Sequence, residues 1–197
     1  MVAPTEGEVL EALQTTGAVL DGHFILSSGK HAARYIQCAR LLQHPDSAHR
    51  VCLLLGERAQ TFGPIDAVVG PALGGIIVAY ELARVLSIRG LFTERQNGRM
   101  TLRRGFEIKK GERVLIVEDV VTTGGSSLEV ADVVKRCGAE ILGIACIVDR
   151  RPKDTELPLP LVSAIKLKID AFEPEACPLC RQGIPAVKPG SRKQTSP

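Results

Sequence analysis

Two adjacent carboxylates, Glu118 and Asp119, are the residues of this sequence for which a chemical role is easiest to argue. They follow four aliphatic residues, 114–117, a pattern typical of a buried parallel strand. Open α/β sheets bind their ligands at the carboxyl ends of such strands. Beyond the acids, residues 122–127 are two threonines, two glycines and two serines, small residues whose backbone N–H groups can surround an anion. Segment 114–127 therefore predicts a phosphate site beside two acid groups.

A helix is expected to follow this segment and to hold it in place. The valines within residues 130–134 share one face, Ser126 with Glu129 fits a capping box, and Gly138 is a suitable stop. A lysine-dependent phosphate loop is excluded, because no Gly-Lys-Ser/Thr triplet occurs, and no Gly-x-Gly-x-x-Gly follows a strand. Backbone amides must then do most of the anion binding.

A second strand, glycine-rich turn and helix precede the first unit. Residues 65–69 predict a short buried strand, residues 70–75 contain three glycines, and residues 76–86 predict a helix. Two such turns in one sheet converge on one ligand, so the amides of Gly74 and Gly75 are candidates for binding a diphosphate group.

The other expected elements complete an α/β fold. We predict a mostly parallel sheet of five strands with helices on both faces. The additional helices are 4–17 and 45–62, and the additional strands are 20–26, 34–38, 91–93, 141–148 and 161–169, of which the first two form a hairpin and 91–93 an edge strand.

Residues 94–106 contain four arginines around a polar, glycine-containing centre. This composition favours a mobile loop that closes on an anion, with Arg95 and Arg99 as candidate ligands. A solvated arginine run is the alternative.

Composition narrows the class of protein. The hydrophobic content of 45% and charged content of 24% are those of a globular protein, and the aromatic content of 4% argues against stacking on nucleic acid bases. The net charge of +3 comes mostly from the basic residues of the last seventeen positions. Residues 1–10 lack the apolar core of a signal peptide, no apolar run reaches the length of a membrane span, and four cysteines lie in apolar patterns, so we expect a reducing cytoplasm.

The C-terminal region contains one Cys-x-x-Cys pair, Cys177 and Cys180, before a basic tail that is expected to be flexible. One such pair is half a zinc site, and neither a second pair nor a pair of histidines follows nearby in the sequence. The pair is consequently not assigned to a metal here. A redox-sensitive pair, a site shared between subunits and a simple turn all remain open.

Segment 114–127 resembles the 5-phosphoribosyl 1-diphosphate (PRPP) signature of the type I phosphoribosyltransferases. Residues 24–35, with the order Phe-Ile-Leu-Ser-Ser-Gly and a later Tyr35, resemble the N-terminal hood of orotate phosphoribosyltransferases. The resemblance implies the type I phosphoribosyltransferase fold, with a catalytic domain over residues 1–175, a hood over about 1–40 and a separate segment 176–197.

The same resemblance implies transfer of the 5-phosphoribosyl group from PRPP to orotate in pyrimidine synthesis. It also implies a homodimer in which the arginine segment reaches the neighbouring site, and Mg²⁺ carried by PRPP rather than by protein side chains alone. Glu118, Asp119 and Arg99 would be catalytic, and Lys30, Thr122 and Arg150 would contact orotate. PRPP would be bound by Gly74, Gly75, Arg95, Glu118, Asp119, Val120, Val121, Thr122, Thr123, Gly124, Gly125 and Ser126.

This sequence departs from the family pattern in its lysines. Many members carry a lysine where Ser27 and Gly74 stand here, and no lysine occurs between Thr93 and Ile108. Three alternatives therefore stay open: a purine phosphoribosyltransferase, a PRPP-sensing regulator without catalysis, and a structural protein that keeps only the fold. A purine has no carboxylate to bind Arg150, and the nearly neutral body without a helix-turn-helix pattern speaks against a DNA-binding regulator.

Overall fold

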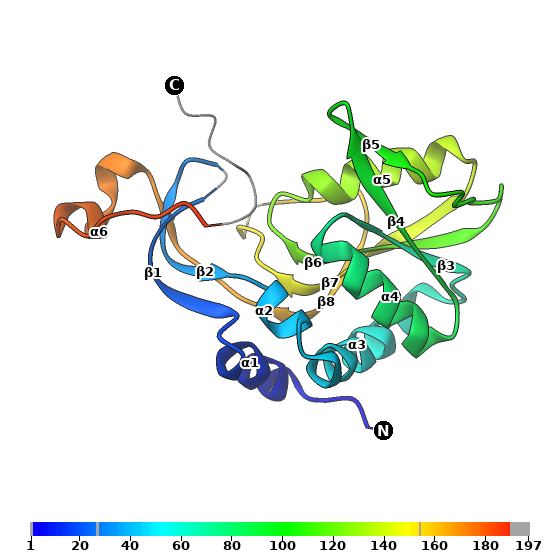
Figure 1. Cartoon of the computed structure of the whole chain (residues 1–197), viewed down its shortest axis with the longest axis horizontal. Helices are drawn as coiled ribbons and strands as arrows, with labels where there is room; N and C mark the ends of the chain where they lie inside the picture. The colour runs from blue at the N-terminus through cyan, green and yellow to red at the C-terminus, as the bar shows by residue number, and fades with distance from the viewer. Residues whose placement is uncertain (1, 27, 154, 190–197) are drawn as a thin grey trace.

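The computed structural model describes residues 2–26, 28–153 and 155–189. A large α/β domain is built on a six-stranded sheet, and a smaller antiparallel sheet lies beside it (Figure 1). Within these residues, no helix combines the length and the apolar character that crossing a membrane requires.

The large sheet has the strand order β5-β4-β3-β6-β7-β8. All neighbouring pairs are parallel except β4 with β5. The prediction of a mostly parallel α/β sheet is confirmed, but the sheet has six strands rather than five. The strands are β3 (Ala67–Pro71), β4 (Arg89–Gln96), β5 (Arg99–Leu102), β6 (Arg113–Val121), β7 (Glu140–Asp149) and β8 (Leu161–Lys166).

The sixth strand arises from the arginine segment. Residues 94–106 were expected to form a mobile loop after an edge strand, but β4 lies inside the sheet and turns into β5, which takes the edge. Asn97 and Gly98 form the turn with φ angles of 51° and 77°. An Asn-Gly pair favours a tight hairpin because both residues tolerate positive φ. The arginines are therefore presented by a β-hairpin.

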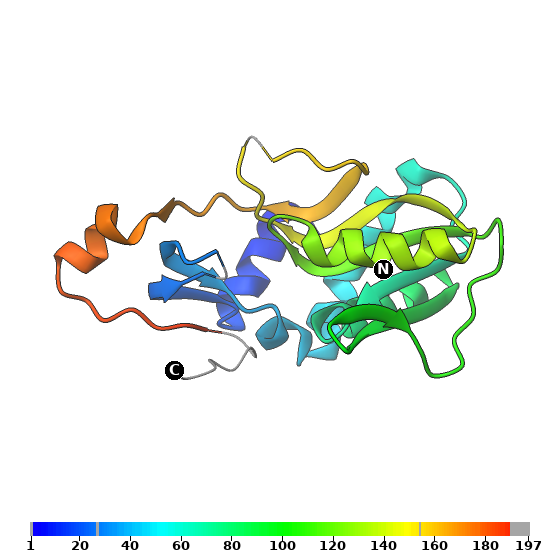
Figure 2. The same ribbon diagram turned by 90° about the horizontal axis from the view of Figure 1, so that it is seen from above.

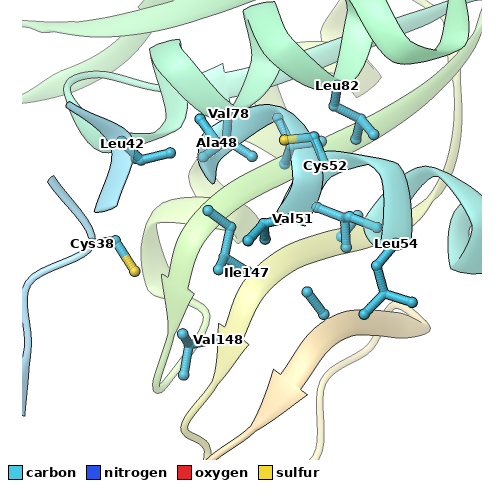
Figure 3. Close-up of a cluster of buried hydrophobic side chains, with 14 of the residues drawn as sticks. Cys38, Leu42, Ala48, Val51, Cys52, Leu54, Val78, Leu82, Ile147 and Val148 are labelled. Carbon is cyan, nitrogen blue, oxygen red and sulfur yellow. The ribbon is translucent and has the colours of Figure 1, made fainter. Parts of the chain in front are cut away.

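Helices cover both faces of the sheet, as predicted. Along β6, Leu115 and Val117 join the hydrophobic cluster under α1 (Glu6–Thr15), α3 (Pro45–Ala59) and α4 (Gly74–Leu86). Val114 and Ile116 join the cluster under α5 (Gly125–Arg136). Alternate side chains of a strand point to opposite faces, so β6 is buried on both sides. Figure 3 shows part of the first cluster, where Val51 of α3 and Leu82 of α4 pack near Ile147 of β7. A 3-10 turn (Gln60–Phe62) and a short helix, α2 (Ala39–Leu42), complete this side.

The smaller sheet joins the two ends of the chain. The predicted hairpin is β1 (Val19–Ile25) with β2 (His31–Ile36), and β9 (Ala171–Phe172) adds a third antiparallel strand. A 3-10 turn (Pro174–Ala176) and α6 (Pro178–Arg181) follow β9, and the chain then runs back along the hairpin (Figure 2).

Two backbone hydrogen bonds fix this return. The Ile25 N–H donates to the Val187 carbonyl at 2.8 Å, and the Val187 N–H donates to the His23 carbonyl at 2.9 Å. Val187 thus lies against the hairpin, within a segment that the sequence predicts to be a flexible tail. The rest of that tail, residues 190–197, lies outside the described residues.

Candidate functional site

A cavity of about 320 Å³ lies at the carboxyl end of β6, where the sequence predicts an anion site. The turn between β6 and α5 forms most of its wall, and the tip of the β4–β5 hairpin closes one side. Its lining residues are Arg95, Glu118, Val120, Val121, Thr122, Thr123, Gly124, Gly125, Ser126, Ser127 and Glu129.

The start of α5 supplies free backbone donors to this cavity. Gly124 is the N-cap, with φ of 77°, and no side chain caps the helix. The predicted capping box of Ser126 and Glu129 is therefore wrong, because Glu129 is bonded to Arg95 instead. In the described part of the chain, the N–H groups of residues 123–127 have no acceptor. Uncapped amides at a helix N-terminus favour an anion.

The Ser127 hydroxyl is a further donor at the same place. Its oxygen is buried and has no hydrogen-bond partner among the described residues. Ser127 was not selected as a site residue from the sequence, although a hydroxyl in the first turn of a helix that follows a glycine pair is a recognisable signal. A buried polar atom without a partner marks a position where a ligand oxygen would be stabilised.

The two acids point in different directions, because neighbouring residues of a strand face opposite sides. Glu118 lines the cavity. Asp119 instead faces the start of α4, where a Cβ atom built on Gly74 would lie 2.5 Å from its Oδ2 atom. Its Oδ1 atom accepts a hydrogen bond from the Val120 N–H at 2.8 Å.

Burial controls the charge of both acids. Removal from water raises the pKa of Glu118 well above its ordinary value, and the neighbouring Asp119 charge raises it further. Burial likewise raises the pKa of Asp119 against the lowering effect of its hydrogen bonds. Two buried carboxyl groups without a nearby cation are electrostatically unfavourable, so the pair suits a ligand that brings positive charge.

The second glycine-rich turn meets the first one. Gly74 and Gly75 are the first residues of α4, and their N–H groups have no acceptor within the described chain. The contact of Gly74 with Asp119 places this helix start beside the end of β6. Gly74 does not line the cavity itself. The contact brings the start of α4 to the end of β6, while the convergence of the two turns on one ligand and the binding role of these amides stay predictions.

The arginines of the hairpin differ in their partners. Arg95 lines the cavity and forms two hydrogen bonds to Glu129, at 2.7 and 2.6 Å. Arg103 and Arg104 pair with the carboxylate of Glu94. Arg99 is exposed, and no carboxylate among the described residues lies within 4.0 Å of it. Arg99 is thus available to bind an anion, as its predicted role requires.

Arg150 follows β7, and its N–H donates to the Val121 carbonyl at 2.8 Å. Burial lowers the pKa of its guanidinium group, and the salt bridges of the described chain include none to Arg150. Tyr35 of β2 lies near it: burial raises the pKa of the Tyr35 hydroxyl, Asp119 adds to this, and Arg150 opposes it. A half-buried arginine without an acid partner is suited to a ligand carboxylate. The sequence pattern assigns Tyr35 to the hood, and it gives no signal that Asp119 and Arg150 both influence this hydroxyl.

Lys30 lies at the turn of the hood hairpin and pairs with Glu173 at 2.8 Å. It does not line the cavity, and neither does Arg150. His31, the residue after Lys30, is buried in the hood next to His23. The structure therefore brings Thr122 to the cavity but does not bring Lys30 there.

Comparisons with known proteins agree with this arrangement. The family model described as "Phosphoribosyl transferase domain" matches residues 37–173. A protein named orotate phosphoribosyltransferase from Caldicellulosiruptor bescii is 52% identical over 187 residues, which cover 94% of this chain and 97% of that protein. Another of the same name from Desulforamulus reducens is 50% identical over 188 residues, which cover 95% and 98%.

A solved structure shows the same fold. The crystal structure of orotate phosphoribosyltransferase from Aeropyrum pernix superposes with a TM-score of 0.70 at 33% identity, covering 81% of this chain and 93% of that one. Because the family model spans most of the chain and the identity to these relatives extends over nearly its whole length, the chain belongs to the orotate phosphoribosyltransferase family.

Proposed function

We propose that the chain transfers the 5-phosphoribosyl group from PRPP to orotate, which yields orotidine 5′-monophosphate and diphosphate. The observation that carries the proposal is the cavity at the end of β6, where uncapped amides stand beside the buried acids Glu118 and Asp119. Such a site suits a phosphorylated sugar that develops positive charge during the reaction. The names of the close relatives support orotate as the acceptor.

The first part of the mechanism is binding of the 5′-phosphate. The amides of residues 123–127 and the hydroxyls of Thr122, Thr123, Ser126 and Ser127 would donate to its oxygens. The positive end of the α5 dipole adds to the attraction. No lysine lines this cavity, so the phosphate would be held mainly by the backbone.

The second part is stabilisation of the ribose as its bond to diphosphate breaks. Positive charge builds at C1, and Glu118 and Asp119 would stabilise it from beside the ribose hydroxyls. The raised pKa of each acid shows that its charge is poorly compensated in the protein alone. Arg99 of the hairpin would contact the departing diphosphate and exclude water.

Magnesium fits this donor set as a substrate-borne ion. Mg²⁺ prefers oxygen ligands and keeps several waters, so PRPP itself would hold it, with the two carboxylates nearby as additional or water-mediated ligands. When bound, the ion neutralises charge on the diphosphate. The two buried carboxylates, which have no paired cation in the described chain, would lie close to the positive charge of this ion.

Orotate would be oriented by its carboxylate. Arg150 would grip it through two parallel hydrogen bonds, a geometry that lysine does not offer. We also assign Thr122 and Lys30 to the orotate side, with Lys30 approaching from the hood. A purine base would leave the half-buried Arg150 without an acid partner.

We further propose a cytoplasmic homodimer in which the β4–β5 hairpin serves the partner's site. Leu73, Ile77 and Tyr80 are 73%, 43% and 70% exposed, and their spacing places them on one side of α4. An exposed apolar stripe of this kind indicates an interface, and a second copy of the chain would cover it. None of the six cysteines forms a disulfide in the structure, which suits a reducing compartment. The domain division at residue 175 stays part of this proposal.

One assay tests the activity. The purified full-length protein is incubated with PRPP and Mg²⁺ and, separately, orotate, uracil, adenine, hypoxanthine or xanthine. We expect turnover with orotate alone. Turnover of a purine without turnover of orotate would reject the acceptor and leave the fold and the PRPP site in place.

A further inference from the structure

Two histidines and two cysteines meet in the hood, outside the substrate site. His23 lies on β1, His31 on β2, and Cys177 and Cys180 flank the start of α6. One potential ligand atom from each residue lies within 4.8 Å of the other three. The sequence hides this cluster, because about 150 residues separate the histidines from the cysteines.

The distances match a tetrahedral site. Cys177 Sγ lies 3.4 Å from His23 Nε2, and Cys180 Sγ lies 3.7 Å from the same atom and 3.2 Å from His31 Nδ1. The two nitrogens are 2.8 Å apart. Zinc with ordinary Zn–S and Zn–N bonds would set sulfur and nitrogen ligands about 3.6 Å apart and two nitrogens about 3.3 Å apart. These four separations need changes of at most about half an ångström, and the widest separation in the cluster, up to 4.8 Å, would have to close by about 1 Å to place all four atoms around one ion.

A hydrogen bond at the other ring nitrogen of His23 turns the lone pair of Nε2 toward the centre of the cluster. His23 Nδ1 lies 2.7 Å from the Ile184 carbonyl oxygen. A carbonyl only accepts hydrogen bonds, so Nδ1 carries the proton and Nε2 presents a lone pair to the two sulfurs. Metal-binding histidines typically show this arrangement, in which the second ring nitrogen donates to a carbonyl or carboxylate.

The hood also needs a stabilising centre. His23, His31 and Cys177 are 2%, 8% and 0% exposed. The other buried side chains around them, Phe24 and Leu26 among them, belong to neither main hydrophobic cluster. A three-stranded sheet with so few apolar residues gains little from burial, and small modules of this kind often depend on a metal or a disulfide.

We propose that His23, His31, Cys177 and Cys180 bind one structural Zn²⁺ ion. Thiolate and imidazole ligands in a tetrahedral set favour zinc, and four protein ligands leave no open position for catalysis. The ion would join the N-terminal hairpin to the C-terminal segment. Because Lys30 precedes His31 and pairs with Glu173, the ion would also hold the turn that carries this lysine.

Metal analysis of the full-length protein tests the proposal. We expect about one zinc per chain, as measured by mass spectrometry of the metal after dialysis in zinc-containing buffer and gel filtration. Cys180→Ser is the preferred variant, because this thiol is exposed and its loss is least disruptive to folding. Because the site then has one thiolate fewer, this variant should retain less than roughly a fifth of the wild-type zinc. Cys137→Ser and His44→Gln change partly or fully exposed residues outside the cluster and should keep full occupancy.

Two further readouts separate zinc from the competing arrangements. Replacement by Co²⁺ should give the visible absorption of a tetrahedral cobalt site with thiolate ligands, and a strong chelator should lower the wild-type Tm but not that of Cys180→Ser. Wild-type protein that remains free of zinc after supplementation would overturn the proposal. A mass lower by two hydrogen atoms, without zinc, would identify a Cys177–Cys180 disulfide and would overturn it as well.

Discussion

The carboxylate of Asp119 lies against the backbone of Gly74. A Cβ atom at position 74 would stand 2.5 Å from Oδ2 and 2.6 Å from Cγ of Asp119. This close approach joins the start of α4 to the end of β6, so the second glycine-rich turn lies next to one of the two acids. A side chain at position 74 would therefore collide with the Asp119 carboxylate unless that carboxylate moved.

Gly74→Ala should impair the reaction by displacing Asp119. We expect kcat/KM for PRPP to fall at least about tenfold and the free energy of unfolding to fall by roughly 1 to 3 kcal/mol, as for other overpacked sites. Steady-state kinetics and urea unfolding measure the two effects. Gly7→Ala is the matched control, since its Cβ would meet nothing nearer than Thr5 Oγ1 at 3.8 Å. Wild-type kinetics for Gly74→Ala would contradict the proposed contact.

The variants Asp119→Asn and Glu118→Gln should be less active and more stable than the wild type. Each substitution should lower turnover, Asp119→Asn by roughly 10²-fold, because a preorganised charge at the reacting ribose is lost. The same substitutions should raise the Tm of the ligand-free protein at pH 7, since the charged form of each buried acid is unfavourable there and an amide has no charged form.

The gain in Tm from removing a buried carboxyl group should depend on pH. Burial raises both carboxyl pKa values in the folded chain, so the folded state binds protons that the unfolded state releases. Proton binding by the two acids therefore stabilises the folded state most below the unfolded pKa, about 4.3 for glutamate. This stabilisation is lost as pH rises toward the raised folded pKa values. The Tm advantage of Glu118→Gln should shrink as pH falls toward that value. A Tm difference that grows in acid would refute the assignment.

Arg150→Ala should weaken orotate binding more than PRPP binding. The loss of two charge-assisted hydrogen bonds, together worth about 2 to 3 kcal/mol, predicts a rise in the orotate KM of roughly 30- to 150-fold. Arg150→Lys should recover only part of the loss, because lysine cannot form both bonds in parallel. Arg34→Ala removes an exposed arginine that pairs with Asp21 and should leave the orotate KM unchanged. Equal effects of Arg150→Ala on both substrates would reject its assignment to orotate.

Arg99 allows a test of the shared site. Arg99→Ala should lower kcat strongly, whereas Arg103→Ala removes a cation that is already paired with Glu94 and should have a small effect. If the hairpin serves the partner subunit, mixed dimers of Arg99→Ala and Asp119→Asn chains contain one intact site. Random mixing should then restore about a quarter of the wild-type activity. The double variant Arg99→Ala/Asp119→Asn, mixed with either single variant, is the control and should restore none. Failure of the two single variants to complement would place Arg99 in its own subunit's site.

Local patterns were sufficient where a segment carries its own signal. The aliphatic run before Glu118 predicted β6, and Gly138, with φ of 73°, follows α5 as predicted. The Asn97–Gly98 pair is an equally local signal for a hairpin turn, whereas the polar composition of residues 94–106 predicted a mobile loop. The predicted edge strand and mobile loop were wrong for that reason. The Ser126–Glu129 capping box was wrong because α5 begins at Gly125 with Gly124 as its N-cap, which places Ser126 inside the first turn, and Glu129 bonds Arg95, 34 residues away.

The sequence by itself determined the parallel α/β core, the turn at residues 122–127 that we propose as the phosphate site, and the family to which the chain belongs, because each depends on residues that are close together in the chain. Only the tertiary structure decided that Asp119 meets Gly74, that among the described residues Arg95 pairs with a carboxylate while Arg99 does not, and that His23 and His31 meet Cys177 and Cys180. These relationships depend on which strands lie side by side and on where the chain returns after β9. No periodicity in the sequence encodes such distances, since folding brings Cys180 to His23, 157 positions away.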